Sequence, residues 1–175
     1  MKNFNATRTS KKWVRKTKRP QGLIHARKTK RAARALETIR NIESPKKIPK
    51  ILTYVRKLDP FVFEELLLTV LDEAGYRIRR SQRYTRDGGC DGCFRDENNR
   101  EILLQAKRYS SHIKPTHVKE FGKLVGNFNA YYGIFVHTGR TGPKSHISKP
   151  RNVTIISGNH LVRLLLQPKD TFLRR

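Results

Sequence analysis

The chain has 175 residues and carries 39 Lys and Arg against 14 Asp and Glu, which gives a formal net charge of +25 at pH 7. Domains usually run about 100 to 200 residues, so the length allows one domain and an extension. The cationic excess favours a polyanionic partner, nucleic acid first, over a small-molecule substrate. A membrane-spanning helix needs roughly 18 consecutive apolar residues, and the sequence offers no such stretch and no apolar core of a secretory signal. We therefore expect a cytoplasmic protein without a membrane partner, and the small number of cysteines suits a reducing compartment.

More than half of the net charge lies in residues 1–50. A basic run there has too little apolar surface to offset chain entropy, so we expect it to be disordered when free and to contact DNA phosphates. This run contains Lys11, Lys12, Arg15, Lys16, Lys18 and Arg19. Residues 29–42 follow with apolar side chains at helical spacing, which predicts a short basic helix. Because Pro45 and Pro49 then interrupt the pattern, we place the domain boundary near Lys50, with a basic arm at 1–50 and the folded domain at 51–175.

The folded domain begins with a short apolar face after residue 51 and then its most clearly marked helix. Asp59 is a good N-cap, Pro60 suits the first helical position, and Gly75 suits the C-terminal cap. Glu64 and Glu65 are expected on the solvent side of this helix. The pattern then predicts strands at 76–84, 90–95 and 101–109, a helix at 115–127, strands at 131–137 and 153–157, and a helix at 159–166. This αβββαβ order, extended by a strand and a helix, predicts an α/β fold with a central mixed sheet flanked by helices.

Three polar residues are expected to meet on this sheet. Side chains alternate between the faces of a strand, so Gln105 and Lys107 share a face while Ala106 points to the other. The rest of that strand is apolar on both faces, and a lysine there needs an anion or a ligand as compensation. Asp91 lies on the preceding strand, and the short Asn98–Asn99 turn would bring its carboxylate beside Gln105.

Such a group of side chains suits metal-assisted hydrolysis of a phosphodiester. Mg²⁺ or Mn²⁺ prefers oxygen ligands, and we expect these from the Asp91 carboxylate, the Gln105 side-chain carbonyl and the Ala106 backbone carbonyl. Lys107 would orient or help to deprotonate the attacking water and offset negative charge on the phosphate. The sequence therefore predicts a catalytic site at these positions.

The same segments resemble the catalytic domain of the Mrr restriction endonucleases between about residues 58 and 166. The resemblance is carried by Phe63-Glu64-Glu65-Leu66, Gly75-Tyr76, Asp87-Gly88-Gly89-Cys90-Asp91-Gly92, Gln105-Ala106-Lys107-Arg108-Tyr109 and Val136-His137-Thr138-Gly139. This family is a branch of the PD-(D/E)XK nucleases in which Gln commonly replaces the acidic residue before the Lys. The resemblance implies a restriction-endonuclease-like fold, a site of Asp91, Gln105 and Lys107 with Glu64 as a fourth catalytic group, and double-stranded DNA, including modified DNA, as substrate.

Several alternatives stay open at this point. A DNA-binding protein could keep the fold without activity, and a structure-selective nuclease for DNA junctions could share the core. A ribosomal type of RNA-binding protein fits the basic tail but not the polar cluster on the strand. Cutting both strands usually requires two protomers, so a homodimer on DNA is compatible with an endonuclease.

The remaining candidate residues receive weaker expectations. Arg140 and Lys144 flank a loop after a predicted strand and are expected to contact DNA phosphates or solvent. Cys90 and Cys93 would point to opposite faces of a strand, which disfavours a zinc site. Histidines that show no pairing at ligand spacing are expected at the surface or in loops, without a catalytic role; they are His112, His117, His137, His146 and His160.

Overall fold

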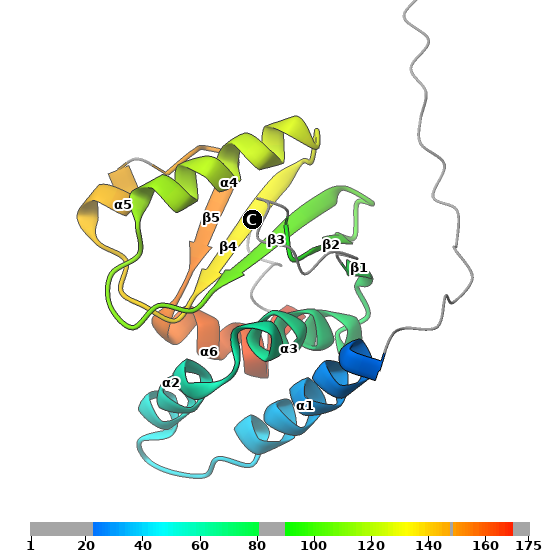
Figure 1. Cartoon of the computed structure of the whole chain (residues 1–175), viewed down its shortest axis with the longest axis vertical. Helices are drawn as coiled ribbons and strands as arrows, with labels where there is room; N and C mark the ends of the chain where they lie inside the picture. The colour runs from blue at the N-terminus through cyan, green and yellow to red at the C-terminus, as the bar shows by residue number, and fades with distance from the viewer. Residues whose placement is uncertain (1–22, 81–89, 148, 170–175) are drawn as a thin grey trace, which may run out of the picture.

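The computed structural model describes residues 23–80, 90–147 and 149–169 of the chain (Figure 1). Its helices are α1 (Leu23–Arg40), α2 (Lys47–Lys57), α3 (Pro60–Glu73), α4 (Pro115–Asn127), α5 (Pro143–Ile147) and α6 (Gly158–Leu166). Its strands are β1 (Arg77–Arg80), β2 (Gly92–Arg95), β3 (Glu101–Lys107), β4 (Tyr132–His137) and β5 (Val153–Ile156). None of these helices is long and apolar enough to cross a membrane.

The strands form one mixed sheet in the order β1-β2-β3-β4-β5. β1, β2 and β3 pair antiparallel, whereas β3, β4 and β5 pair parallel. The turn between β2 and β3 is short and uses Asn99 at a positive φ of 60°, a conformation that Asn tolerates well. A parallel connection needs a longer crossover, and α4 supplies it between β3 and β4. The predicted α/β fold with a mixed sheet is confirmed.

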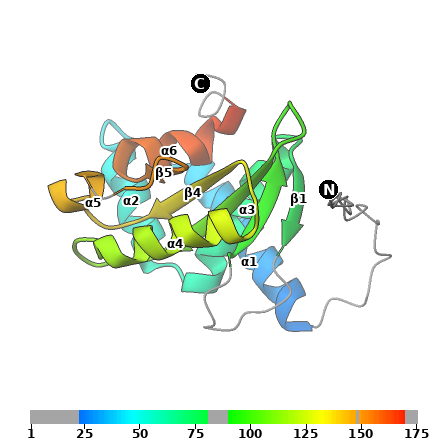
Figure 2. The ribbon, with the colours of Figure 1, turned by 90° about the horizontal axis from the view of Figure 1, so that it is seen from above.

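Helices cover both faces of the sheet (Figure 2). Leu103, Phe135 and Val153 belong to the hydrophobic cluster on the α4 side. Leu104 and Val136 belong to the larger cluster on the side of α3 and α6. The alternation of the two clusters along β3 follows from the period of two in a strand. It also fixes which face each polar residue of β3 occupies.

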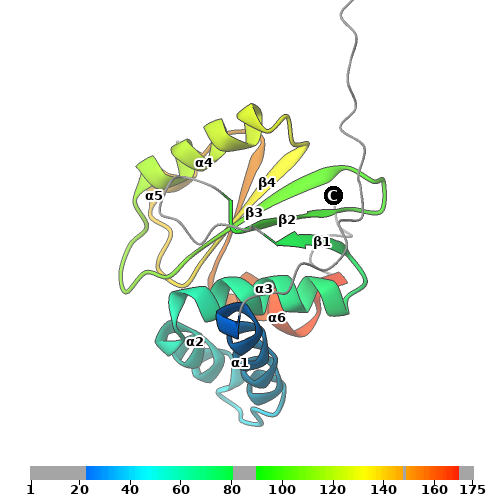
Figure 3. The same cartoon turned by 45° about the vertical axis from the view of Figure 1, so that its right-hand side comes forward.

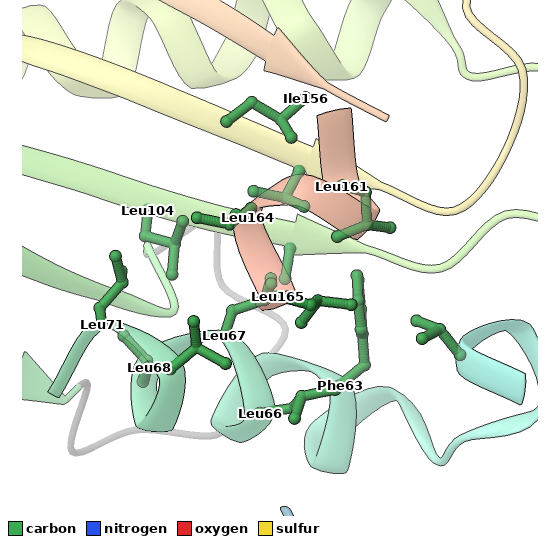
Figure 4. Close-up of a cluster of buried hydrophobic side chains, with 14 of the residues drawn as sticks. Phe63, Leu66, Leu67, Leu68, Leu71, Leu104, Ile156, Leu161, Leu164 and Leu165 are labelled. Carbon is green, nitrogen blue, oxygen red and sulfur yellow. The ribbon is translucent and has the colours of Figure 1, made fainter. Parts of the chain in front are cut away.

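Helix α3 forms where the sequence predicts it. The Asp59 carboxylate accepts hydrogen bonds from the backbone N–H groups of Phe61 at 3.0 Å and Val62 at 3.3 Å, and Pro60 occupies the first turn. Its apolar stripe packs against α6 and the sheet (Figure 4). The labelled side chains there are Phe63, Leu66, Leu67, Leu68 and Leu71 from α3, Leu104 from β3, Ile156 from β5, and Leu161, Leu164 and Leu165 from α6. This packing holds the beginning of α3 close to the sheet.

Helix α1 lies alongside α3 on the side away from the sheet (Figure 3). It begins at Leu23, earlier than the helix expected from residue 29. One face is buried in the same hydrophobic cluster as α3, through Ala32, Ala35, Leu36 and Ile39. The core therefore extends across the boundary expected near Lys50.

Two further differences concern short helices. α2 begins at Lys47 and contains Pro49, which is tolerated because the first turn of a helix needs no N–H donor there. α5 begins at Pro143 in a stretch where a loop was expected.

Candidate active site

Strand β3 positions Gln105 and Lys107 on one face of the sheet. Leu104 and Ala106 pack toward α3 and α6, while Leu103 packs toward α4. By alternation Gln105 and Lys107 share the face of Leu103. Gln105 is 9% exposed and Lys107 is half-buried, so two polar groups follow the apolar stretch 102–104 near the end of the strand.

Asp91 lies directly before β2, beside these residues. The antiparallel register pairs Gly92 with Leu104, and one residue further along each segment places Asp91 opposite Gln105. The Asp91 backbone N–H donates to the Leu104 carbonyl at 3.0 Å, and its side-chain Oδ2 accepts the Ala106 backbone N–H at 2.6 Å. The backbone of β3 thus fixes one carboxylate oxygen of Asp91.

Glu64, in the first half of α3, is the fourth predicted site residue. It is half-buried, and desolvation raises the pKa of its carboxyl to about 8, with the nearby Asp91 charge adding to the increase and Lys28 and Lys107 opposing it. Asp91 also has a raised pKa of about 6, because burial outweighs the hydrogen bond from Ala106 and the charge of Lys107. The charges of Asp91 and Lys107 thus act on Glu64, and Gln105 lies opposite Asp91 on β3. The catalytic role of these four residues stays a prediction.

The residues fit a divalent cation through the chemistry of their donors. Two carboxylates that repel each other in a partly desolvated site are relieved by a doubly charged ion. Among the described residues no group of three or more His, Cys, Asp and Glu side chains could hold a metal. Asp91 and Glu64, with the amide oxygen of Gln105 and the carbonyl of Ala106, instead form the sparse oxygen set that suits Mg²⁺, which usually keeps several waters.

His137 is a buried neighbour of the site, and the expectation of a surface or loop position for it is wrong. It ends β4, pairs in register with Lys107 and is 0% exposed. Its Nε2 lies 2.9 Å from the Thr141 hydroxyl oxygen, while among the described residues its Nδ1 has no hydrogen-bond partner. Burial lowers the pKa of His137 to about 4, so the ring is neutral at pH 7. The apolar run that precedes it in β4 is the signal for this burial.

The predicted DNA contacts fall in different parts of the chain. The run from Lys11 to Arg19 lies outside the described residues. Arg140 and Lys144 are exposed after β4, which runs parallel to β3, so they lie toward the end of the sheet that carries Lys107.

Helix α1 adds a basic surface near the site that the sequence pattern did not predict. Lys28 Nζ lies 3.8 Å from the centroid of the Phe61 ring at the start of α3, and its charge reaches Glu64. The outer face of α1 exposes four further cations: Arg27, Lys30, Arg31 and Arg34.

Comparison with known proteins identifies the family. A family model described as restriction endonuclease, of the Mrr catalytic type, matches residues 55–165. The chain belongs to the Mrr restriction endonuclease family. The matched range contains all four predicted site residues of this Mrr domain. No relative was found among the curated proteins.

Three solved structures resemble the Mrr domain. The MspJI restriction endonuclease in complex with a 27-mer oligonucleotide has a TM-score of 0.47 and 19% identity over 73% of this chain and 34% of that chain. Restriction endonuclease FokI has a TM-score of 0.48 and 11% identity over 81% and 31%. The modification-dependent restriction endonuclease AspBHI has a TM-score of 0.44 and 20% identity over 82% and 38%. The chain therefore spans about a third of the length of each of these proteins.

Proposed function

We propose that this Mrr domain is a metal-dependent endonuclease that hydrolyses phosphodiester bonds of double-stranded DNA. One observation carries the proposal. The Asp91 carboxylate accepts a hydrogen bond from the Ala106 N–H beside Gln105 and Lys107, and its charge also acts on Glu64. An acid, an amide and an ammonium meet there near the C-terminal end of the central strand β3. This arrangement can hold a cation and an anionic phosphate at the same place.

The residues take distinct parts in the proposed reaction. Asp91 and Glu64 would hold Mg²⁺ or Mn²⁺, with the Gln105 and Ala106 oxygens as further ligands. The bound ion supplies Lewis-acid polarisation of the phosphate and a more acidic water. Lys107 would orient that water and offset the charge that develops on the phosphate. A homodimer on DNA would place one such site at each DNA strand. We also propose a cytoplasmic location, which the free thiols of Cys90 and Cys93 suit.

The first test is metal dependence. Purified protein incubated with supercoiled plasmid DNA should nick or linearise it with Mg²⁺ or Mn²⁺ and lose the activity in excess EDTA. The carboxylate and carbonyl donors predict this result, because they bind hard cations and offer no thiolate or imidazole set for zinc. Full cleavage in EDTA would exclude the mechanism. Metal-independent binding without cleavage under any condition would instead favour an inactive DNA-binding protein of the same fold.

A second test concerns the DNA path across α1. We propose that the exposed cations of α1, together with the basic run before residue 23, contact DNA phosphates next to the candidate active site. The double variant Arg27→Ala/Arg31→Ala should weaken duplex binding and reduce the slope of log K against log salt by about 1.8, since each phosphate contact contributes about 0.9.

The matched control removes two exposed charges elsewhere, Lys123→Ala on α4 and Arg163→Ala on α6. Labelled duplex titrated at several salt concentrations in EDTA gives both slopes without cleavage. Equal slopes for the two double variants would refute a special role for α1.

A further inference from the structure

A cavity lies on the sheet away from the candidate active site. It has a volume of about 500 Å³, within the range of small-molecule sites. Ile102, Ile134 and Ile156 contribute to its apolar wall, and all three belong to the hydrophobic cluster on the α3 and α6 side. Gln105 and Lys107 face the opposite side, and the rise of about 3.3 Å per residue places Lys107 roughly 16 Å along β3 from Ile102. The cavity is therefore separate from the site described above.

Aromatic rings form much of the cavity wall. Tyr131 is 58% exposed, and the Arg100 guanidinium carbon lies 4.0 Å from the centroid of its ring. Tyr76 and Phe94 pack edge to face with centroids 5.2 Å apart. The Tyr132 hydroxyl is hydrogen-bonded to the Thr154 hydroxyl, which holds that ring against β5. Phe94 is 1% exposed and only backs the wall, whereas the exposed Tyr131 ring offers a preformed flat surface for a planar, unsaturated ligand.

Cationic and polar groups accompany the rings. Asp96 Oδ2 accepts a bond from Arg100 Nε at 2.6 Å, so the guanidinium is anchored over Tyr131. Arg151 is exposed on the loop before β5 and contributes a second cation, and the neighbouring Asn152 lines the cavity as well. One anchored and one exposed arginine, partly offset by Asp96, make this end of the cavity attractive to an anion.

We propose that this cavity binds one nucleotide, with its base against the tyrosine rings and its phosphate at Arg151. A nucleotide joins the two features that the cavity selects, a flat unsaturated ring and an adjacent anion. Its source is either a free nucleotide or an unpaired nucleotide of a DNA strand. The inference goes beyond the proposed cleavage and does not require it, because the cavity shares no residue with the candidate active site.

The test measures nucleotide binding by the full chain in EDTA, so that cleavage does not interfere. Saturation-transfer NMR with deoxyadenosine monophosphate, and with deoxyadenosine as the ligand without phosphate, reports binding of the free ligand. Photocrosslinking of a short single-stranded oligonucleotide that contains 5-iodouracil, mapped by mass spectrometry, reports binding of a strand. The test variant is Tyr131→Ala/Arg151→Ala, and both residues are exposed enough for truncation to spare the core.

The matched control is Phe128→Ala/Arg163→Ala, which removes one ring that is 52% exposed and one exposed arginine elsewhere. We expect the test variant to bind the mononucleotide about ten-fold more weakly or worse, the control to match the parent, and deoxyadenosine to bind less tightly than the nucleotide.

Each ligand identifies one source. Mononucleotide binding that the test variant loses supports a free nucleotide, and a crosslink at Tyr131 or Tyr132 supports a strand. The inference is overturned if the test variant binds both ligands like the parent, or if the parent binds neither. If the parent protein bound the nucleotide but did not cleave plasmid DNA, only the proposed endonuclease function would be rejected.

Discussion

Asp91→Asn should reduce DNA cleavage by more than about a hundred-fold while duplex binding stays measurable. Residues that merely orient a metal ligand already cost about 10 to 100-fold when replaced, and Asp91 is proposed as a ligand itself. Asn keeps an oxygen that can accept the Ala106 N–H and removes only the charge, so the fold of β3 should persist. Binding should not suffer, because one negative charge fewer reduces repulsion of the phosphates.

A plasmid assay with Mg²⁺ and a duplex titration in EDTA measure the two effects separately. Asp91→Ala should lose cleavage equally and also destabilise the fold slightly, because the Ala106 N–H loses its acceptor. Glu37→Gln on the exposed face of α1 is the matched control for loss of one carboxylate. If Asp91→Asn cut at the rate of the parent, the site would be misassigned.

Arg80→Ala should lower the free energy of unfolding by about 3 kcal/mol. Arg80 Nε lies 2.6 Å from Glu65 Oε1, and the Glu65 side chain is only 4% exposed. Removal of one partner from a buried pair leaves an uncompensated charge, which typically costs about 3 to 5 kcal/mol. We expect the lower end because the Arg80 side chain is still 24% exposed. Urea denaturation followed by circular dichroism measures the change.

The chain offers a matched surface pair for comparison. Arg40 lies 2.7 Å from Glu73, with both side chains nearly half exposed, so Arg40→Ala should cost about 1 kcal/mol or less. Replacement of both buried partners, as Glu65→Leu with Arg80→Met, should recover most of the loss. An Arg80→Ala variant no less stable than Arg40→Ala would show that the Glu65 carboxylate is not confined as the structure indicates.

The same pair illustrates what the sequence could not supply. Glu65 was expected on the solvent side of its helix, yet it is 3% exposed. Its partner Arg80 lies fifteen positions away on β1, and no local spacing rule connects a helix position with a residue on the next strand. His137 was misplaced for a different reason: the apolar run before it in β4 indicates burial, but the polar character of the residue itself favoured the surface.

Other features were predictable because local signals agreed with one another. Asp59, Pro60 and Gly75 bracket α3 with capping chemistry, and the apolar stripe between them has helical spacing. The positions of Gln105 and Lys107 on one face of β3 follow from strand alternation, and the short turn before β3 sets the register that brings Asp91 beside them. The contribution of Glu64 could not be derived in this way and came only from the family resemblance.

The packing of α1 determines how much of the chain would have to be transferred with the candidate active site if the Mrr domain were fused to another protein. The family match starts at residue 55, but α1 covers a side of α3 through Ala32, Ala35, Leu36 and Ile39. A fusion that starts at residue 55 would expose that side of α3 to solvent as a hydrophobic patch prone to aggregation. The transferable unit of this Mrr domain therefore has to include α1 from Leu23 onward, with any fusion joint placed before that residue.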